Sequence, residues 1–336
     1  MRKRAIGKII ACSIFAVIFS CLLAGGLILY HTGALARIVI HDPITGTVEW
    51  LRSTLTGLPG PKLSELDNLL PVVQPGYIPA GYAEGDGAYA EAPESIDVDW
   101  AAGAVVIAAS DAYNEVRVSE FAGKLDPLTQ TGEAPTYAMV HRMQDGKLNV
   151  RAHRPGFASY HLTNNEKTLL ITMPKTHLAE LSLDVAATTI TLIDLDVNTL
   201  DLDSAAVRLD IAGCGFDKAK LDLAAVEGGF TQCRIGELDM DCAAGEVLFA
   251  LTNVPDKIDI DGAASDYRFT LPVDASFTAV MDSVVAKLEV IGFSNISQQK
   301  GKTIVGDGAS EFRFDISAGT VQITAEGQSV PIWTNE

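Results

Sequence analysis

Apolar and polar residues alternate through most of the chain after residue 95, within a segment that recurs. The segment reads Φ-x-Φ-D-x-A-A-G-x-Φ-x-Φ, where Φ is apolar and x is any residue. Alternation with a period of two gives a strand one apolar face, so each copy predicts two short strands around a turn of small residues. Seven copies align, beginning at Ile96, Leu181, Leu200, Leu221, Leu238, Ile258 and Phe312.

The spacing of the copies predicts how they are arranged. The five central copies, from Leu181 to Ile258, begin 19, 21, 17 and 20 residues apart. A fixed period near this length is typical of coils that stack with matching residues above one another. We therefore predict an all-β fold over residues 93–330, a single-chain β-solenoid (β-helix) with coils of ~20 residues. A β-sandwich is the alternative, since regularly spaced strands also occur there.

The two gaps in the repeat are too long for one coil, so irregular coils and inserts are predicted there. One gap runs from Ile96 to Leu181 and the other from Ile258 to Phe312. Residues 120–135 are predicted to form a loop. Short strand-like pieces occur in the first gap, at residues 116–118, 137–142, 148–150 and 169–173.

An uncharged stretch of 22 residues, Ile9 to Tyr30, lies near the N-terminus and predicts a transmembrane helix. A helix of that length spans roughly 33 Å, which matches a hydrocarbon core of about 30 Å. Four basic residues precede it: Arg2, Lys3, Arg4 and Lys8. They place residues 1–8 in the cytoplasm and the bulk of the chain outside, as in a single-pass cell-membrane protein. Cleavage after Ala34-Leu35-Ala36 and lipidation at Cys21 are alternatives.

Residues 31–92 are predicted to hold short membrane-proximal helices and a linker. Asp42-Pro43 is a typical helix start and Gly57 a typical stop, with apolar residues at helical spacing between them. That helix either lies on the membrane surface or packs against the base of the outer domain. Residues 63–70 predict a second short helix. Residues 71–95 contain four prolines and four glycines and predict an extended spacer.

Charge and cysteine content limit which partners and which cysteine sites the sequence predicts. The net charge is −18, and the part beyond the basic tail is more acidic still, so nucleic acid and anionic lipid headgroups should be repelled. Cys12 and Cys21 lie in the apolar stretch. Cys214, Cys233 and Cys242 show no C-x-x-C spacing. Buried free thiols are therefore predicted rather than a zinc site or a disulfide framework.

The aspartates of the repeat align in two columns that are predicted to point outward, because their neighbours point inward. Stacked coils would place successive carboxylates about 5 Å apart, where like charges repel. One interpretation is a calcium site, formed by Asp184, Asp203, Asp241 and Asp261, since calcium takes several oxygen ligands. The other is that the carboxylates cap turns and keep the face soluble. The first column holds Asp97, Asp201, Asp222, Asp239 and Asp259, and the second holds Asp99, Asp184, Asp203, Asp241, Asp261 and Asp315.

Other residue patterns indicate no catalytic site. The six histidines lack a metal-binding spacing such as H-E-x-x-H, and neither G-x-S-x-G nor a phosphate-binding glycine loop occurs. The acids recur regularly, whereas a glycosidase needs one irregular pair of carboxylates. We therefore predict no enzymatic activity, no cofactor and no metal apart from the calcium hypothesis.

The repeat copies resemble a bacterial putative-adhesin domain, a family of unknown function with a β-solenoid fold. The segment from Gly306-Asp307-Gly308 to Phe312-Arg313-Phe314-Asp315 and on to Ile323 resembles it most, and the resemblance covers residues 93–326. It implies a membrane segment before the domain and carries over no catalytic residue.

Anchor, acidity and resemblance together predict a non-catalytic, adhesin-like cell-surface protein. Its acidic β-solenoid would bind the cell wall, a carbohydrate or a protein outside the membrane. One alternative is an envelope-stress or signalling accessory that acts through a membrane partner, because the short tail has no room for an output domain. The other is a wall-active polysaccharide enzyme.

Overall fold

The computed structural model describes residues 80–126, 131–133, 139–151, 167–283, 285–299 and 301–327. They belong to one of two compact units of the chain, Pro59–Glu336. These residues form an all-β structure without a helix, as the alternating pattern predicted. The strands of this part join in one 17-stranded sheet.

The predicted tail, transmembrane helix and membrane-proximal helices, all before residue 71, lie outside the described residues. Within the described ranges, no helix is long and apolar enough to cross a membrane. The anchor at residues 9–30 therefore stays a prediction from the sequence.

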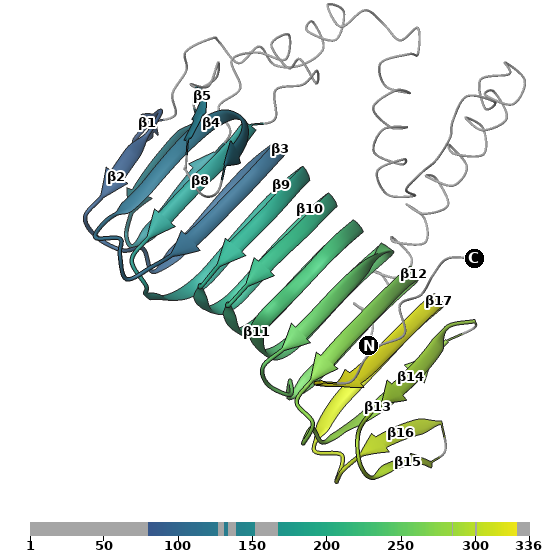
Figure 1. The fold of residues 1–336 in the computed structure, drawn as a ribbon. Coiled ribbons are helices and arrows are strands. Elements are labelled where there is room, and N and C mark those ends of the chain that lie inside the picture. The colour runs from purple at the N-terminus through teal and green to yellow at the C-terminus, as the bar shows by residue number, and fades with distance from the viewer. Residues whose placement is uncertain are drawn as a thin grey trace, which may run out of the picture. The chain divides into compact units, whose positions relative to one another are not determined.

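Six long strands lie side by side and pair in parallel (Figure 1). Each is hydrogen-bonded to its neighbours along most of its length. In spatial order they are β3 (Ser95–Ala109), β9 (His177–Ile193), β10 (Asp196–Ala212), β11 (Gly215–Leu251), β12 (Lys257–Leu271) and β17 (Ser310–Ala325).

The register of these strands follows the sequence repeat. Leu181 pairs with Leu200, and Leu200 pairs with Ala219, so that each step is 19 residues. The long strand β11 contains two repeats, because a Cβ on Gly245 would lie 2.2 Å from the carbonyl oxygen of Val226, again 19 residues earlier. We call each repeat of in-register residues a rung.

The fourth copy is displaced by two residues from the sequence alignment. Leu202 pairs with Leu221, so this copy starts at Ala219 and not at Leu221. A displacement of two keeps every inward side chain inward, because successive side chains of a strand alternate between its faces. The correction also removes Gln232, the one polar residue in the predicted apolar pairs, from those pairs.

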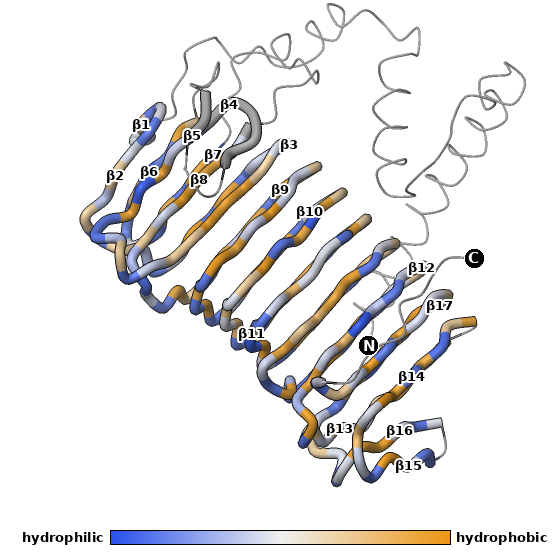
Figure 2. Tube along the Cα trace, in the orientation of Figure 1, coloured by the Kyte–Doolittle hydropathy of each residue, from blue (hydrophilic) through white to orange (hydrophobic). Residues whose placement is uncertain are grey.

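Each rung bends twice. Buried and exposed residues alternate along β10, and the alternation changes phase at Asn198-Thr199 and at Ala205-Ala206. Two successive outward residues require the strand to change direction, so the inward side chains of one rung face a shared core. The small residues predicted as a turn mark the second bend, and the strand continues through it. Figure 2 shows the alternation as changes between orange and blue along the strands.

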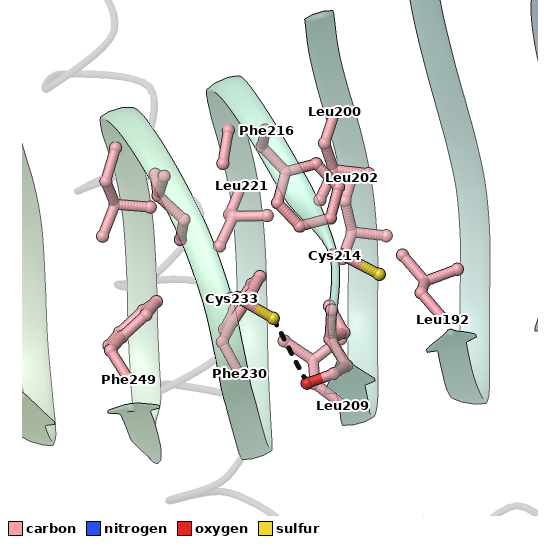
Figure 3. Close-up of a cluster of buried hydrophobic side chains, with 14 of the residues drawn as sticks. Leu192, Leu200, Leu202, Leu209, Cys214, Phe216, Leu221, Phe230, Cys233 and Phe249 are labelled. Carbon is pink, nitrogen blue, oxygen red and sulfur yellow. Dashed lines mark hydrogen bonds between the residues drawn. The ribbon is translucent and has the colours of Figure 1, made fainter. Parts of the chain in front are cut away.

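The core consists of matching apolar side chains that lie against one another from rung to rung (Figure 3). Phenylalanines give the clearest case. The ring of Phe249 stacks on Phe230, with centroids 5.0 Å apart, and on Phe269, with centroids 4.7 Å apart. All three side chains are buried. This arrangement agrees with the repeat, in which similar residues recur at the same offset.

The first gap in the repeat holds additional strands at the N-terminal end of the sheet. Both β7 and β8 pair in parallel with β3, and β4 pairs antiparallel with β8. These strands confirm the strand-like pieces of the sequence. The strands there are β4 (Val116–Asp126), β5 (Thr131–Glu133), β6 (Val140–Gln144), β7 (Lys147–Arg151) and β8 (Lys167–Met173).

Two sequence expectations differ from the structure in this region. Much of the predicted loop at 120–135 is strand, because β4 continues to Asp126 and β5 pairs with it. Within the predicted spacer at 71–95, β1 (Ala83–Glu84) pairs with β6, and β2 (Gly87–Tyr89) pairs with β4. Local composition predicts extended chain there but does not encode these distant partners.

The second gap holds four shorter strands at the C-terminal end. Both β13 and β14 pair in parallel with β17, while β16 pairs antiparallel with β13 and with β15. Phe277 of β13 stacks on Phe312 of β17, with ring centroids 4.7 Å apart, and so continues the core. These strands are β13 (Phe277–Asp282), β14 (Lys287–Ile291), β15 (Ile296–Gln299) and β16 (Lys302–Val305).

Candidate functional site

Aspartates in the middle segment of each rung form one in-register column. Between the two bends, alternate side chains point outward, and the same position is occupied by aspartate in rung after rung. We call this set the aspartate column. It consists of Asp99, Asp184, Asp203, Asp222, Asp241, Asp261, Asp315 and Asp282.

The structure brings the residues of the calcium hypothesis into this one column and adds Asp222. The alignment had placed Asp222 in the neighbouring column, whereas it pairs with Asp203. The step from Asp222 to Asp241 is 19 residues, the same as the step from Val226 to Gly245 that relates the two repeats of β11. Once the two-residue displacement is corrected, the column has an aspartate at every rung.

The neighbouring column is mixed in charge. Lys220 stands opposite Asp201, and Arg313 stands opposite Asp259. Asp97 lies 2.9 Å from the Lys147 ammonium and 3.1 Å from the Arg151 guanidinium. Basic side chains therefore offset the carboxylates of this column, and the predicted run of five aligned aspartates is broken there.

Burial and, to a smaller extent, repulsion raise the pKa of two members of the aspartate column. Partial burial raises the pKa of Asp203, and the carboxylates of Asp222 and Asp184 raise it further. Burial likewise raises the pKa of Asp241, with added contributions from Asp261 and Asp222. Neighbouring strands lie about 4.8 Å apart, a distance at which like charges repel even in water. Asp222 contributes to both shifts because it lies between these two residues.

The column has one basic end. The Arg151 guanidinium lies 3.5 Å from the carboxylate of Asp99, the aspartate of the first long strand. No group of three or more histidine, cysteine, aspartate or glutamate side chains in the described part of the chain is arranged to hold a metal ion. The column therefore presents its carboxylates as a row along the sheet direction, one on each rung. Calcium binding stays a hypothesis.

Replacement of Asp222 by asparagine is expected to stabilise the protein. The variant keeps the shape of the side chain and removes the charge that faces both Asp203 and Asp241. Each repulsion at this spacing in water is below about 1 kcal/mol and is screened by salt, so the expected gain is about 0.5–1 kcal/mol. Urea denaturation at low salt measures it. Asp210→Asn is the control, because Asp210 pairs with Thr191 and Gly229 and has no aspartate opposite.

The gain should depend on pH with a defined sign. A carboxyl whose pKa is raised by folding binds its proton more tightly in the folded state, so lowering the pH through that pKa stabilises the fold. In the wild type, the raised pKa values of Asp203 and Asp241 therefore increase the free energy of unfolding as the pH falls from about 7 toward about 4. The advantage of Asp222→Asn should shrink over the same window. An advantage that stays constant, or a variant less stable than the wild type, would contradict the repulsion.

A second polar cluster lies at the N-terminal end, where the sequence singled out nothing. The Tyr89 hydroxyl is hydrogen-bonded to Nδ1 of His141, and the two rings pack edge to face. Burial lowers the pKa of His141, so its imidazole is neutral at pH 7. A Cβ on Gly87 would lie 2.1 Å from that imidazole, so any larger residue would have to displace the ring. The contact fixes β2 against β6, and a separation of 52 residues hides it from sequence patterns.

Comparison with known proteins gives similar structures but no family. No protein-family model matches the chain, and no curated protein matches it. A putative cell adhesion protein from Clostridium sporogenes ATCC 15579 is 11% identical with a TM-score of 0.31, over 73% of this chain and 100% of that one. A putative adhesin from Bacteroides fragilis NCTC 9343 is 10% identical with a TM-score of 0.31, over 75% and 99%. A putative lipid binding protein from Parabacteroides distasonis ATCC 8503 is 11% identical with a TM-score of 0.32, over 74% and 97%.

Two of these three neighbours carry adhesion names. At such scores and identities, the likenesses assign neither a family nor a function to this chain. The functional argument therefore depends on the chain's own residues.

Proposed function

We propose that this protein is a non-catalytic, adhesin-like component of the cell surface. An N-terminal transmembrane helix would hold a β-solenoid outside the membrane, and the outward face of that solenoid would bind cell wall, carbohydrate or protein. The solenoid is supported by rungs of 19 or 20 residues that pair in parallel, bend twice and share one core. The proposed anchor is supported by the uncharged stretch at residues 9–30, which is long enough to span a bilayer.

The observation that carries the binding role is the aspartate column. Packing explains the inward residues, because they bury apolar surface, but it does not require aspartate at the matching outward position of every rung. Burial and the like charges of the column both raise the pKa values of Asp203 and Asp241, so keeping these carboxylates charged costs stability. A costly arrangement that runs through all the rungs is typical of a surface used for recognition.

A sedimentation assay with purified cell-wall sacculi tests the proposal. The full chain in lipid nanodiscs should sediment with the sacculi, and a triple variant with Asp203, Asp222 and Asp241 changed to asparagine should lose binding several-fold. Asp210→Asn is the matched control and should bind like the wild type, because it removes a carboxylate from another face of β10.

Two results would overturn the proposed role. One is a wild-type protein that binds sacculi, soluble wall polysaccharides and extracted surface proteins no better than empty nanodiscs do. The other is hydrolysis of a wall glycan that a single carboxylate substitution abolishes, which would make the protein an enzyme. Protease digestion of intact cells tests the location separately, since an outer domain should be cleaved without lysis.

A further inference from the structure

Two of the cysteines in the described part of the chain form a stacked pair. Cys214 lies in the turn between β10 and β11, and Cys233 lies 19 residues later, within β11. That separation equals the register step between these rungs. The backbone N–H of Arg234 donates a hydrogen bond of 2.9 Å to the carbonyl of Cys214, so the two cysteines occupy adjacent rungs. The spacing of the two cysteines in the sequence equals the repeat period, so the spacing alone indicates that they lie on adjacent rungs.

The two thiols lie inside the protein on adjacent rungs, with the Cys214 sulfur turned away from Cys233 (Figure 3). Both side chains are buried. The Cys233 thiol donates to the carbonyl of Ile211 at 3.6 Å, so it leans toward the rung that carries Cys214 (Figure 3). Cys214 Sγ accepts a hydrogen bond of 3.4 Å from the N–H of Leu195 on the rung before it. Rotation of the Cys214 side chain toward Cys233 would exchange this weak bond for a sulfur–sulfur contact.

The backbone spacing suits a covalent link. Neighbouring strands lie about 4.8 Å apart, and disulfides join Cα atoms about 4.4–6.8 Å apart. We propose that Cys214 and Cys233 form a disulfide between adjacent rungs when the chain folds under oxidising conditions. The third cysteine, Cys242, lies beside the second bend of its rung and accepts a hydrogen bond from the Ser265 hydroxyl. It has no cysteine partner among the described residues.

The reaction is thiol–disulfide exchange with a small or protein disulfide as oxidant. The Cys233 thiolate attacks one sulfur of the oxidant, which releases one oxidant thiol and leaves a mixed disulfide on Cys233. The Cys214 thiolate then attacks Sγ of Cys233 and releases the second oxidant thiol. The cysteines lose two protons and two electrons in total, and the oxidant gains them.

Burial determines when the exchange takes place. With exposures of 1% for Cys214 and 0% for Cys233, the folded rungs enclose both sulfurs. An oxidant therefore reaches them while the rungs assemble or during local opening. Once formed, the bond would be shielded from reductants by the same packing.

Refolding of the purified full chain in detergent, with and without glutathione disulfide, tests the proposal directly. Free thiols are then alkylated in denaturant without reduction, and the peptides are identified by mass spectrometry. In the oxidised sample, a peptide pair joined through Cys214 and Cys233 should appear, lighter by two hydrogen atoms than the separate peptides, with Cys242 alkylated. The midpoint of thermal unfolding should rise by roughly 5–10 °C relative to the reduced protein.

Variants distinguish this pair from other thiol chemistry. Cys242→Ser should keep both the linked peptides and the thermal shift, whereas Cys214→Ser should lose both and leave Cys233 alkylated. Alkylation of Cys214, Cys233 and Cys242 together in the oxidised, correctly folded sample would overturn the proposal, as would a link that involves Cys242. The test runs in solution, so its outcome does not depend on the proposed surface role.

Discussion

Alanine at Gly228 is expected to destabilise the protein by roughly 3–5 kcal/mol. A Cβ on Gly228 would lie 2.0 Å from the carbonyl oxygen of Leu209 and 2.9 Å from its carbonyl carbon. The obstacle is the backbone of the neighbouring rung, which cannot rotate aside as a side chain can. Gly228 also has a φ of +115°, a conformation that strains any residue with a Cβ. The variant must therefore separate the rungs locally or lose the pairing around Leu209. Urea denaturation followed by far-UV circular dichroism measures the loss.

Gly301→Ala is the matched control for this prediction. Gly301 has a φ of +78°, and nothing lies within 4 Å of the position its Cβ would take. Alanine at this position is expected to destabilise the protein only through the strain of a positive φ, by about 1–2 kcal/mol. The difference between the two variants combines the contact with the neighbouring rung and the less favourable φ of Gly228. Equal losses, or a Gly228 variant that unfolds like the wild type, would show that Gly228 does not pair with Leu209.

That pairing is the part of the repeat that sequence alignment placed wrongly. The alignment matched apolar residues and therefore chose Leu221 and Leu223 as the first pair of the fourth copy. The structure uses Ala219 and Leu221 instead. Both choices keep the same residues inward, because a shift of two leaves the alternation unchanged. Hydrophobic pattern alone cannot distinguish them. The deciding contacts are between rungs, such as the close approach of Gly228 to a carbonyl.

For the candidate site too, the sequence predicts which side chains point outward but not the exact register. The outward orientation of the aspartates and their alignment in a column follow from alternation and period. The completeness of the column depends on the register of Asp222, which only the pairings reveal. The ends of the sheet were less predictable for another reason. Strands β7 and β8 both pair with β3, and β2 pairs with β4, so their positions depend on contacts between distant residues. Local patterns predict such strands but not their partners.

Truncation of Phe249 to alanine is expected to cost roughly 3–5 kcal/mol. Its ring is fully buried and lies between two others, with an interplanar angle of 14° to Phe230 and 6° to Phe269. Alanine would remove the apolar surface and both ring contacts, and it would leave a cavity that the paired backbones on either side cannot close. Urea denaturation should show a lower midpoint with an unchanged slope, because the folded state stays as compact as before.

Leu248→Ala is the control from the adjacent position. Leu248 points to the opposite side of the strand and is 43% exposed, so its loss should change the free energy of unfolding by about 0.5 kcal/mol or less. Two neighbouring residues of similar hydrophobicity would then differ several-fold in effect, for no reason other than the face they occupy. Phe249→Leu should fall between them, because leucine refills part of the volume but cannot stack. If Phe249→Ala and Leu248→Ala cost the same, the inward stack of phenylalanines does not hold these rungs together. The register that aligns the aspartates would then lose the packing that maintains it.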